Sequence, residues 1–351
     1  MTEQLRFGIV GCGVIGALHA KAISSLPDAQ FVSVVDVIPE RAHQLAQEYS
    51  VTPYVDTQEM YAKEHLDVVT ICTPSGMHGA HAIEAMQAGY HVIVEKPMEI
   101  TLANIEKMLQ VQQETGRKMA VISQHRFDSA TQQVHKLVEE QAFGRLVLGN
   151  ALIPWWRSQQ YYDSGAWRGT WELDGGGVLM NQSIHSIDLL QWLMGHVKSI
   201  YAYTDTLAHR METEDVAVAV LRFASGAVGT IAATTSGYPG TGTRIAIYGD
   251  KGTAVIESDK LKDLHLARDQ SEEVGPYGGV KSSPAAADAG KTGASDPGAI
   301  GADTHALQIE DMIRAIRENG TPLVDGNEGR HPVEIILGIY ESARTGKEVV
   351  L

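Results

Sequence analysis

Four polar side chains in two separate stretches of the sequence are candidates for moving a proton and polarising an oxygen atom. Asn181 and His185 are four residues apart in the segment DGGGVLMNQSIHSIDLL (174–190), and Asp188 follows three residues later. A helix places such positions on one face, while the other positions of this segment are mostly apolar. Lys96 follows the apolar run HVIVE. Imidazole, with an ordinary pKa of about 6.5, suits acid–base chemistry near neutral pH, whereas lysine needs desolvation or a neighbouring cation to act as a base.

Both stretches also have a purely structural interpretation. Taken in isolation, a polar stripe inside an apolar helix favours a structural role: a buried histidine with satisfied hydrogen bonds and an asparagine that caps the helix. Buried polar groups need such partners, because without them each costs about 1–3 kcal/mol. Lys96 would then be a surface cation at the end of a strand. The elements around these residues must decide between the two interpretations.

The N-terminal stretch predicts a dinucleotide-binding turn. Residues 5–10, LRFGIV, are typical of a strand, and they run into GCGVIG (11–16) and then into a helical pattern over 17–26. Glycines in G-x-G-x-x-G allow a tight turn and let a pyrophosphate approach the N-terminus of the helix. Asp36 ends the next predicted strand, 20 residues after Gly16. A carboxylate there binds a ribose 2′-hydroxyl and repels a 2′-phosphate, which favours NAD over NADP, although Arg41 leaves NADP open.

Strands and helices alternate as far as residue 124, which predicts a doubly wound parallel sheet. Strand ends that precede TPSGMH (73–78), EKP (95–97) and QHR (124–126) should meet at the carboxyl edge of this sheet, where ligands bind. The proline of EKP is a candidate for a cis peptide. We therefore predict a Rossmann domain over 1–123 and a second domain over 124–351. The expected cofactor-binding residues are Gly11, Cys12, Gly13, Val14, Ile15, Gly16, Asp36, Thr73, Pro74, His78, Glu95, Lys96 and Gln124.

An aromatic loop over 154–177 precedes the polar stripe and holds four of the five tryptophans. Aromatic faces beside arginines suit either a core or interface role, or the stacking of a sugar ring with guanidinium groups on its hydroxyls or a carboxylate. The expected substrate-binding residues are Arg126, Trp155, Arg157, Trp167, Arg168, Asn181 and His185.

Five strand patterns with short turns follow between 199 and 258 and predict an open antiparallel meander with one face on the helices. The small residues Ala217, Ala219, Ala232, Ala233, Thr234 and Thr235 are expected on the other face, as an oligomer interface. Residues 268–304, rich in Gly, Ala, Ser and Asp, predict an exposed loop, and two helices over 305–320 and 333–346 close the chain.

Composition excludes several classes of partner. The 351 residues carry a formal charge of −15 without a basic run, which argues against nucleic acid and anionic membranes. We find no secretory leader and no apolar stretch long enough to span a bilayer. Cys12 and Cys72 are expected to be free thiols of a cytoplasmic protein, and without nearby ligands they do not predict a metal site.

Taken together, these motifs resemble the Gfo/Idh/MocA family of oxidoreductases, which includes glucose–fructose oxidoreductase and inositol dehydrogenase. The resemblance rests on GCGVIG, Asp36, TPSGMH, EKP (95–97), the 174–190 segment and the C-terminal PLVDGNEGRHPVEIILGIYESARTGKEV. It implies an α/β chain: a Rossmann domain and a C-terminal α/β domain on a large, mostly antiparallel open sheet, which commonly forms homodimers or homotetramers. It also implies NAD(P)-dependent hydride transfer to or from a secondary alcohol of a sugar or cyclitol.

The resemblance assigns the active-site lysine to Lys96 and the active-site histidine to His185. The family commonly has Asp where this chain has Asn181, and Gly where it has Ser183. Because an amide cannot accept the proton, we hypothesise that His185 takes it, Lys96 polarises the substrate oxygen and Asn181 holds the hydroxyl. Asp188 is expected to orient His185. Two alternatives remain open: NAD-assisted glycoside cleavage through a keto-sugar, and a non-catalytic cofactor-binding homologue. The aromatic loop also looks like that of members acting on UDP-linked amino-sugar acids and on glycosides at C3, which makes Arg157 and Arg168 candidates for binding an anionic group.

Overall fold

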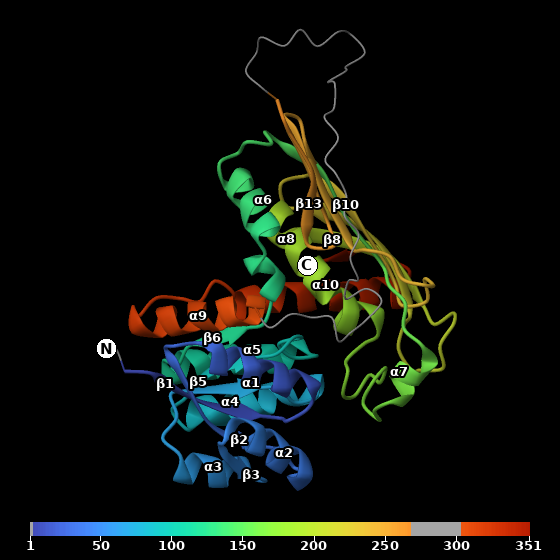
Figure 1. Cartoon of the computed structure of the whole chain (residues 1–351). Coiled ribbons are helices and arrows are strands. Elements are labelled where there is room, and N and C mark those ends of the chain that lie inside the picture. The colour runs from blue at the N-terminus through green and yellow to red at the C-terminus, as the bar shows by residue number, and fades with distance from the viewer. Residues whose placement is uncertain (1–2, 268–302) are drawn as a thin grey trace, which may run out of the picture.

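A computed structural model describes residues 3–267 and 303–351, which form two parts, each built on one sheet (Figure 1). The N-terminal part is a six-stranded parallel sheet covered by helices. The second part is an eight-stranded mixed sheet with helices packed against one face (Figure 1). The predicted fold class, a Rossmann domain followed by an α/β part on a large and mostly antiparallel sheet, is confirmed.

The N-terminal sheet has the strand order β3-β2-β1-β4-β5-β6 with all pairs parallel. The four residues of its central strand β4, VVTI, are all buried, as expected for a strand covered on both faces. The order reverses between β1 and β4, and ligands of doubly wound sheets bind at the carboxyl edge beside this point. Its elements are β1 (Leu5–Val10), α1 (Val14–Ser25), β2 (Ala29–Val35), α2 (Pro39–Tyr49), β3 (Thr52–Tyr54), α3 (Thr57–Lys63), β4 (Val68–Ile71), η1 (Ser75–Met77), α4 (His78–Gln87), β5 (His91–Val94), α5 (Leu102–Thr115), β6 (Met119–Val121) and η2 (Gln124–Phe127).

Helix α9 (Asp303–Arg317) returns from the C-terminal part of the chain to the N-terminal sheet. Ile309, Met312 and Ile313 share a core cluster with residues of α1 and β1, and α9 lies along the Rossmann part in Figure 1. The division into domains over 1–123 and 124–351 therefore stays a prediction, and α9 is the part of the second range that does not follow it. Helix α9 itself packs with the first part, because its apolar side is buried there.

The second sheet has the order β13-β12-β11-β7-β10-β9-β8-β14, so the expected meander is wrong in one respect. Strand β7 lies between β10 and β11 and runs parallel to β10, which separates two strands that are consecutive in the chain. The other pairs are antiparallel. Its elements are α6 (Ser129–Glu139), β7 (Leu146–Pro154), α7 (Gln159–Asp163), η3 (Val178–Ser183), α8 (Ile184–Met194), β8 (Val197–Asp205), β9 (Val216–Phe223), β10 (Val228–Thr234), β11 (Arg244–Gly249), β12 (Gly252–Glu257), β13 (Lys260–Leu266), α10 (Gly326–Thr345) and β14 (Val349–Val350).

The small residues of this sheet do not all face outward. Ala217, Ala219 and Ala233 are buried on the helix-covered face, because side chains alternate along a strand. The open face instead presents Val218 and Val220, which are about half exposed (49% and 52%). The outward side is therefore more apolar than the sequence suggested.

The 174–190 segment is not one regular helix. Val178–Ser183 (η3) is π-helical, and the α-helix α8 begins at Ile184. Such π turns are uncommon and often occur at functional sites. The exposed loop predicted over 268–304 lies almost entirely outside the described residues. Within the described ranges, no helix is both long and apolar enough to cross a membrane.

Candidate active site

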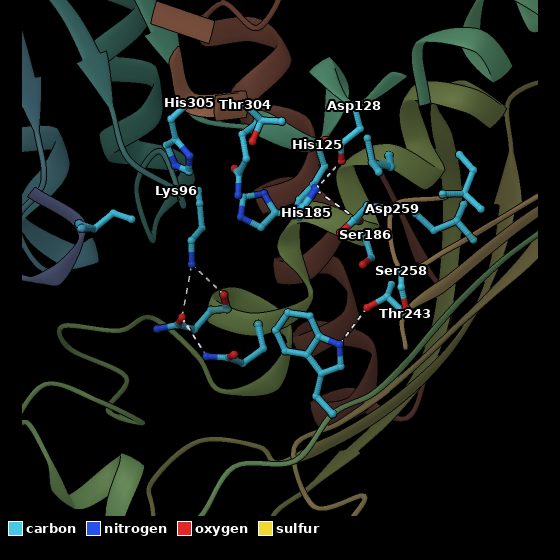
Figure 2. A pocket seen from close by; sticks show the side chains of 18 of the residues that line it. Lys96, His125, Asp128, His185, Ser186, Thr243, Ser258, Asp259, Thr304 and His305 are labelled. Carbon is cyan, nitrogen blue, oxygen red and sulfur yellow. Dashed lines mark hydrogen bonds and ion pairs between the residues drawn. The ribbon is translucent and has the colours of Figure 1, made fainter. Parts of the chain in front are cut away.

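A cavity of about 390 Å³ lies where the two parts meet. Figure 2 shows Lys96 and His185 entering it from different elements, with His125, Asp259 and Thr304 on its walls. The lining comes from α1, the end of β5, η2, the η3–α8 segment, the second sheet and the start of α9. The cavity therefore draws on segments that are far apart in the sequence.

Lys96 follows β5, and its peptide bond to Pro97 is cis, as the sequence suggested. Its Nζ donates to the main-chain oxygen of Asn181 at 2.8 Å and lies 3.4 Å from the side-chain Oδ1 of the same residue. Burial lowers the pKa of Lys96, while the carboxylates of Glu95 and Asp174 oppose this effect. The predicted pair of Lys96 and Asn181 is thus brought together.

Asn181 lies in the π-helical turn, with its amide held on both sides. Its Nδ2 donates to Asp174 Oδ1 at 2.7 Å, and its Oδ1 accepts from Gln182 Nε2 at 3.1 Å. The other carboxylate oxygen of Asp174 accepts from the N–H of Gly169 at 2.9 Å. Asn181 is therefore part of a hydrogen-bonded chain and does not cap a helix.

Glu214 fixes the start of the π-helical turn. Its carboxylate accepts from the N–H groups of Gly177 and Leu179 at 3.0 and 2.9 Å and from the Tyr340 hydroxyl at 2.9 Å. Burial raises the pKa of Glu214 to about 7, against these hydrogen bonds. At Gly177, a side chain would collide with the backbone of Glu214, since a Cβ there would lie 1.9 Å from its oxygen. The third glycine of the GGG run therefore allows this close approach.

His185, in the first turn of α8, faces the cavity and has no side-chain hydrogen bond with any described residue. Its ring packs edge-on against His125, with the ring centroids 5.2 Å apart. Burial, with His125 and Lys96 nearby, holds the pKa of His185 well below its ordinary value. His125 is itself bound to Asp128 at 2.7 Å, and its pKa is raised by Asp128 and Asp259 against the effect of burial. His185 is therefore neutral at physiological pH.

Asp188 does not orient His185, so that expectation is wrong. Its two oxygens accept from Arg126 Nε and Nη2 at 2.8 and 2.6 Å, and it also binds the hydroxyl of Ser123. Arg126 is fully buried and donates a further hydrogen bond to Glu328 at 2.7 Å. Arg126 thus joins the end of the first part to α8 and α10, and the expected substrate-binding role does not fit its position.

The glycine turn has the shape that a dinucleotide needs. Gly11 has a φ of +98°, and a side chain there would strike the backbone of Cys72. Gly16 packs against Gly11, where a Cβ would lie 2.1 Å from its oxygen. Nothing lies within 4 Å of a Cβ built on Gly13. The first and third glycines therefore shape the turn, and the middle one leaves room for a pyrophosphate at the N-terminus of α1.

The predicted ribose-binding residue Asp36 lies directly after β2. Its carboxylate accepts from the N–H groups of Cys12 and Ile38, both at 2.8 Å, which fixes it beside the glycine turn. Further along the sheet edge, Thr73 Oγ1 and Gln124 Oε1 are buried without a hydrogen-bond partner among the described residues. These polar atoms fit a site that is completed by NAD. The remaining predicted residues of the turn are Val14, 85% exposed, and Ile15, which lines the cavity.

Two predicted cofactor residues have other contacts. His78 is almost fully buried, and its two ring nitrogens bind the main-chain oxygens of Pro97 and Thr73 at 2.7 and 2.8 Å. It joins the loop after β4, which contains Thr73 and Pro74, to the loop after β5, and both of its ring nitrogens are used in these contacts. Glu95 lines the cavity, but its carboxylate is bound to His19 at 2.7 Å. The polar groups of both side chains are therefore already bound within the protein, at the carboxyl edge of the sheet.

The aromatic loop contributes only part of its predicted set to the cavity. Trp155 and Arg157 line it, and the indole N–H of Trp155 binds Thr243 at 2.8 Å. Trp167 and Arg168 are not in the lining; Arg168 packs over Trp167 and donates to the Tyr161 hydroxyl at 2.7 Å. Tyr161 does line the cavity, so Arg168 is connected to the cavity wall through its hydrogen bond to Tyr161.

Sequence reasoning missed several groups at this site. His125, Asp259 and His305 line the cavity from three distant segments. His125 belongs to the QHR motif but was not singled out, and no local motif marks Asp259 or His305. Asp174 had one signal, because it directly precedes the GGG run, but its contact with Asn181 depends on the π-helical turn. Gln182, next to Asn181, was also unmarked.

Comparison with known proteins agrees with this geometry. Residues 5–123 match the family model "Oxidoreductase family, NAD-binding Rossmann fold", and residues 131–255 match the "GFO/IDH/MocA C-terminal domain". A solved structure of the WlbA dehydrogenase from Bordetella pertussis, in complex with NADH and UDP-GlcNAcA, is 34% identical over 99% of each chain, with a TM-score of 0.87. The chain belongs to the Gfo/Idh/MocA family. The predicted resemblance and NAD as the cofactor are thereby confirmed.

Curated relatives are more distant. Myo-inositol 2-dehydrogenase of Thermotoga maritima is 25% identical and covers 78% of this chain and 81% of its own length. Levoglucosan dehydrogenase of Pseudarthrobacter phenanthrenivorans is 26% identical, with 97% and 96% covered. These relatives are named as dehydrogenases of a cyclitol and of a sugar derivative, so this level of similarity does not select one substrate.

Proposed function

We propose that this protein is an NAD-dependent dehydrogenase that acts on a secondary hydroxyl of a sugar carrying an anionic group. The observation that carries the proposal is a convergence on one cavity at the carboxyl edge of the Rossmann sheet, where Lys96 and His185 (Figure 2) meet Asn181. Bound NAD supplies the hydride acceptor. The protein's own task is then to hold the alcohol and take its proton.

His185 is the proposed proton acceptor, because its neutral imidazole has no competing hydrogen bond within the described part of the chain. Lys96 is assigned the polarisation of the substrate oxygen in its protonated form, which burial, Arg168 and Arg157 disfavour and the carboxylates of Glu95 and Asp174 favour. Asn181 orients the hydroxyl through an amide that is held on both sides. In this division of roles, neutral His185 is the base and protonated Lys96 is the cation, and the mechanism needs no proton transfer between them.

The anionic substrate class is supported by the arginines of the aromatic loop. Arg157 lies in the cavity wall, with its guanidinium over the Trp155 ring and 2.8 Å from Gln182 Oε1. Arg168 reaches the same wall through Tyr161. Guanidinium groups bind carboxylates and phosphates in preference to neutral hydroxyls. The full-length similarity to the dehydrogenase solved with UDP-GlcNAcA, a nucleotide-linked sugar acid, favours the same class.

A substrate panel tests this proposal. Purified enzyme is assayed for reduction of NAD and of NADP with UDP-GlcNAcA, glucuronate, myo-inositol, levoglucosan and a methyl glucoside, and NMR identifies the oxidised carbon. We expect the highest kcat/KM with the anionic sugars and with NAD, because of Arg157 and Asp36. Preference for neutral cyclitols would contradict the substrate class, and preference for NADP would contradict the role of Asp36. Release of free sugar without NADH would point to glycoside cleavage instead.

We also propose that two copies associate through the open face of the eight-stranded sheet. The exposed residues Val218, Val220 and Tyr203 lie on adjacent strands of that face, and continuous apolar patches on a surface typically mark interfaces. Light scattering of the wild type and of Val218→Lys tests this, with a smaller assembly expected for the variant. The free thiols of Cys12 and Cys72 support a cytoplasmic location.

A further inference from the structure

A buried carboxylate, Asp174, lies behind the contact between Lys96 and Asn181. We infer that Asp174 is a positioning residue: it holds the Asn181 amide with its oxygen toward Lys96 and provides, one residue further back, the negative charge that Asn181 lacks. This inference rests on the proposed function, because it concerns how the same site binds and polarises the alcohol.

The hydrogen bonds define the orientation of the amide. An ionised carboxylate accepts hydrogen bonds and donates none, so the Asn181 Nδ2 group must face Asp174, at 2.7 Å. The Oδ1 atom then points the other way, toward Lys96 Nζ at 3.4 Å and Gln182 Nε2 at 3.1 Å. A flipped amide would place two oxygens against each other at Asp174 and two donors against each other at Lys96. Asp174 therefore excludes the wrong orientation at both ends.

The charge argument concerns the groups that face Lys96. These are the carboxylates of Glu95 and Asp174 and the guanidinium groups of Arg157 and Arg168. Burial and the two arginines lower the pKa of Lys96, whereas the two carboxylates raise it. The Glu95 carboxylate also binds the buried His19. Asp174 is the one of these two carboxylates that accepts a hydrogen bond from Asn181.

Asp174 has four contacts that favour its ionised form. It is also 2% exposed, and burial outweighs these contacts, so that its pKa lies above the ordinary value of an aspartate. The N–H of Gly169, the amide of Asn181 and the positive charges of Lys96 and Arg168 oppose that rise. Asn181 and Lys96, which favour the charged form of the Asp174 carboxylate, are therefore also the groups that connect it to the reacting site.

The test is a charge exchange between positions 174 and 181. The variants are Asp174→Asn, Asn181→Asp and the double variant Asp174→Asn/Asn181→Asp. Asp311→Asn is the matched control, because Asp311 is also buried and accepts from a backbone N–H, that of Leu323 at 2.7 Å, but belongs to α9 at a distance from the cavity. Three quantities are measured: kcat against pH, NADH affinity, and titration of the Lys96 side chain by NMR with ¹³C-labelled lysine, assigned with Lys96→Arg.

We expect Asp174→Asn to move the alkaline limb of kcat and the Lys96 titration downward together, by on the order of one pH unit, because one neighbouring negative charge is lost. Asn181→Asp alone places two carboxylates in direct contact and should reduce kcat at least tenfold. The double variant restores a single carboxylate and should recover most of that loss. Asp311→Asn should change none of these quantities.

An unchanged Lys96 titration in Asp174→Asn would overturn the inference, as would a double variant no more active than Asn181→Asp. The two proposals fail separately. If no sugar is oxidised, the proposed function fails, whereas the lysine titration still measures whether Asp174 acts on Lys96.

Discussion

The two groups proposed to handle the substrate hydroxyl lie in the same cavity but in opposite surroundings. Lys96 is joined through Asn181 to the carboxylate of Asp174. His185 packs against the ring of His125 and hydrogen-bonds to no described side chain. Burial lowers the pKa of both groups, but the carboxylates near the amine of Lys96 oppose this effect, whereas the cationic groups near the imidazole of His185 add to it. The comparison shows how one pocket holds an acid and a base side by side.

The largest expected effect comes from removing the base. His185→Ala should lower kcat by about 10³-fold, within the usual range for a general base, with NADH affinity unchanged. Turnover and NADH fluorescence titration measure the two quantities. Near wild-type turnover would show that Lys96, and not His185, accepts the proton.

Variants of Asp188 distinguish a role in stabilising the position of α8 from a role in the chemistry of His185. Asp188→Asn should lower the free energy of unfolding by about 3 kcal/mol, because the buried Arg126 then loses its main counter-charge. Glu328→Gln, which removes the second and more exposed partner of Arg126, should cost about 1 kcal/mol or less. Chemical denaturation measures both.

The loss of kcat at low pH, which the account assigns to protonation of His185, should occur at the same pH in both variants as in the wild type. The reason is that Asp188 binds Arg126 and Ser123. A shift of that pH in Asp188→Asn alone would show that Asp188 acts on His185 after all.

A smaller effect is expected on the substrate side of the cavity. Arg157→Gln should raise KM for an anionic sugar by about tenfold through the loss of one charge-assisted interaction, and should leave KM for a neutral sugar almost unchanged. Steady-state kinetics with a matched pair, glucuronate and glucose, make the comparison direct. Equal changes for both sugars would mean that Arg157 shapes the wall without reading charge.

The cofactor side of the site could be predicted almost entirely from the sequence, because local geometry determines it. The roles of Gly11 and Gly16 and the position of Asp36 follow from a strand, a turn and a helix that are consecutive in the chain. His78 and Glu95 were the exceptions. The two hydrogen bonds of His78 depend on how the loops after β4 and β5 approach each other, and the carboxylate of Glu95 is bound to His19 of α1.

The substrate side was less predictable, because its contacts join distant segments. Spacing alone suggested that Asp188 would serve His185, but Arg126, 62 residues earlier, binds both carboxylate oxygens. The sequence showed that side chains alternate between the two faces of the second sheet, but we predicted Ala217 and Ala219 on the open face, and they are buried on the helix-covered face. The π-helical turn that aims Asn181 at Lys96 depends on Glu214, which no local pattern connects to that turn.

The pH dependence of kcat in the wild type and in Lys96→Met tests the central assignment most directly. A neutral His185 with a lowered pKa predicts full activity down to below pH 6.5 and a loss only as the imidazole becomes protonated. Deprotonation of Lys96 predicts a second loss at alkaline pH. In Lys96→Met the account predicts a lower plateau on which the acidic limb remains and the alkaline limb is absent. Disappearance of the acidic limb instead would contradict it, because Lys96 would then be the base.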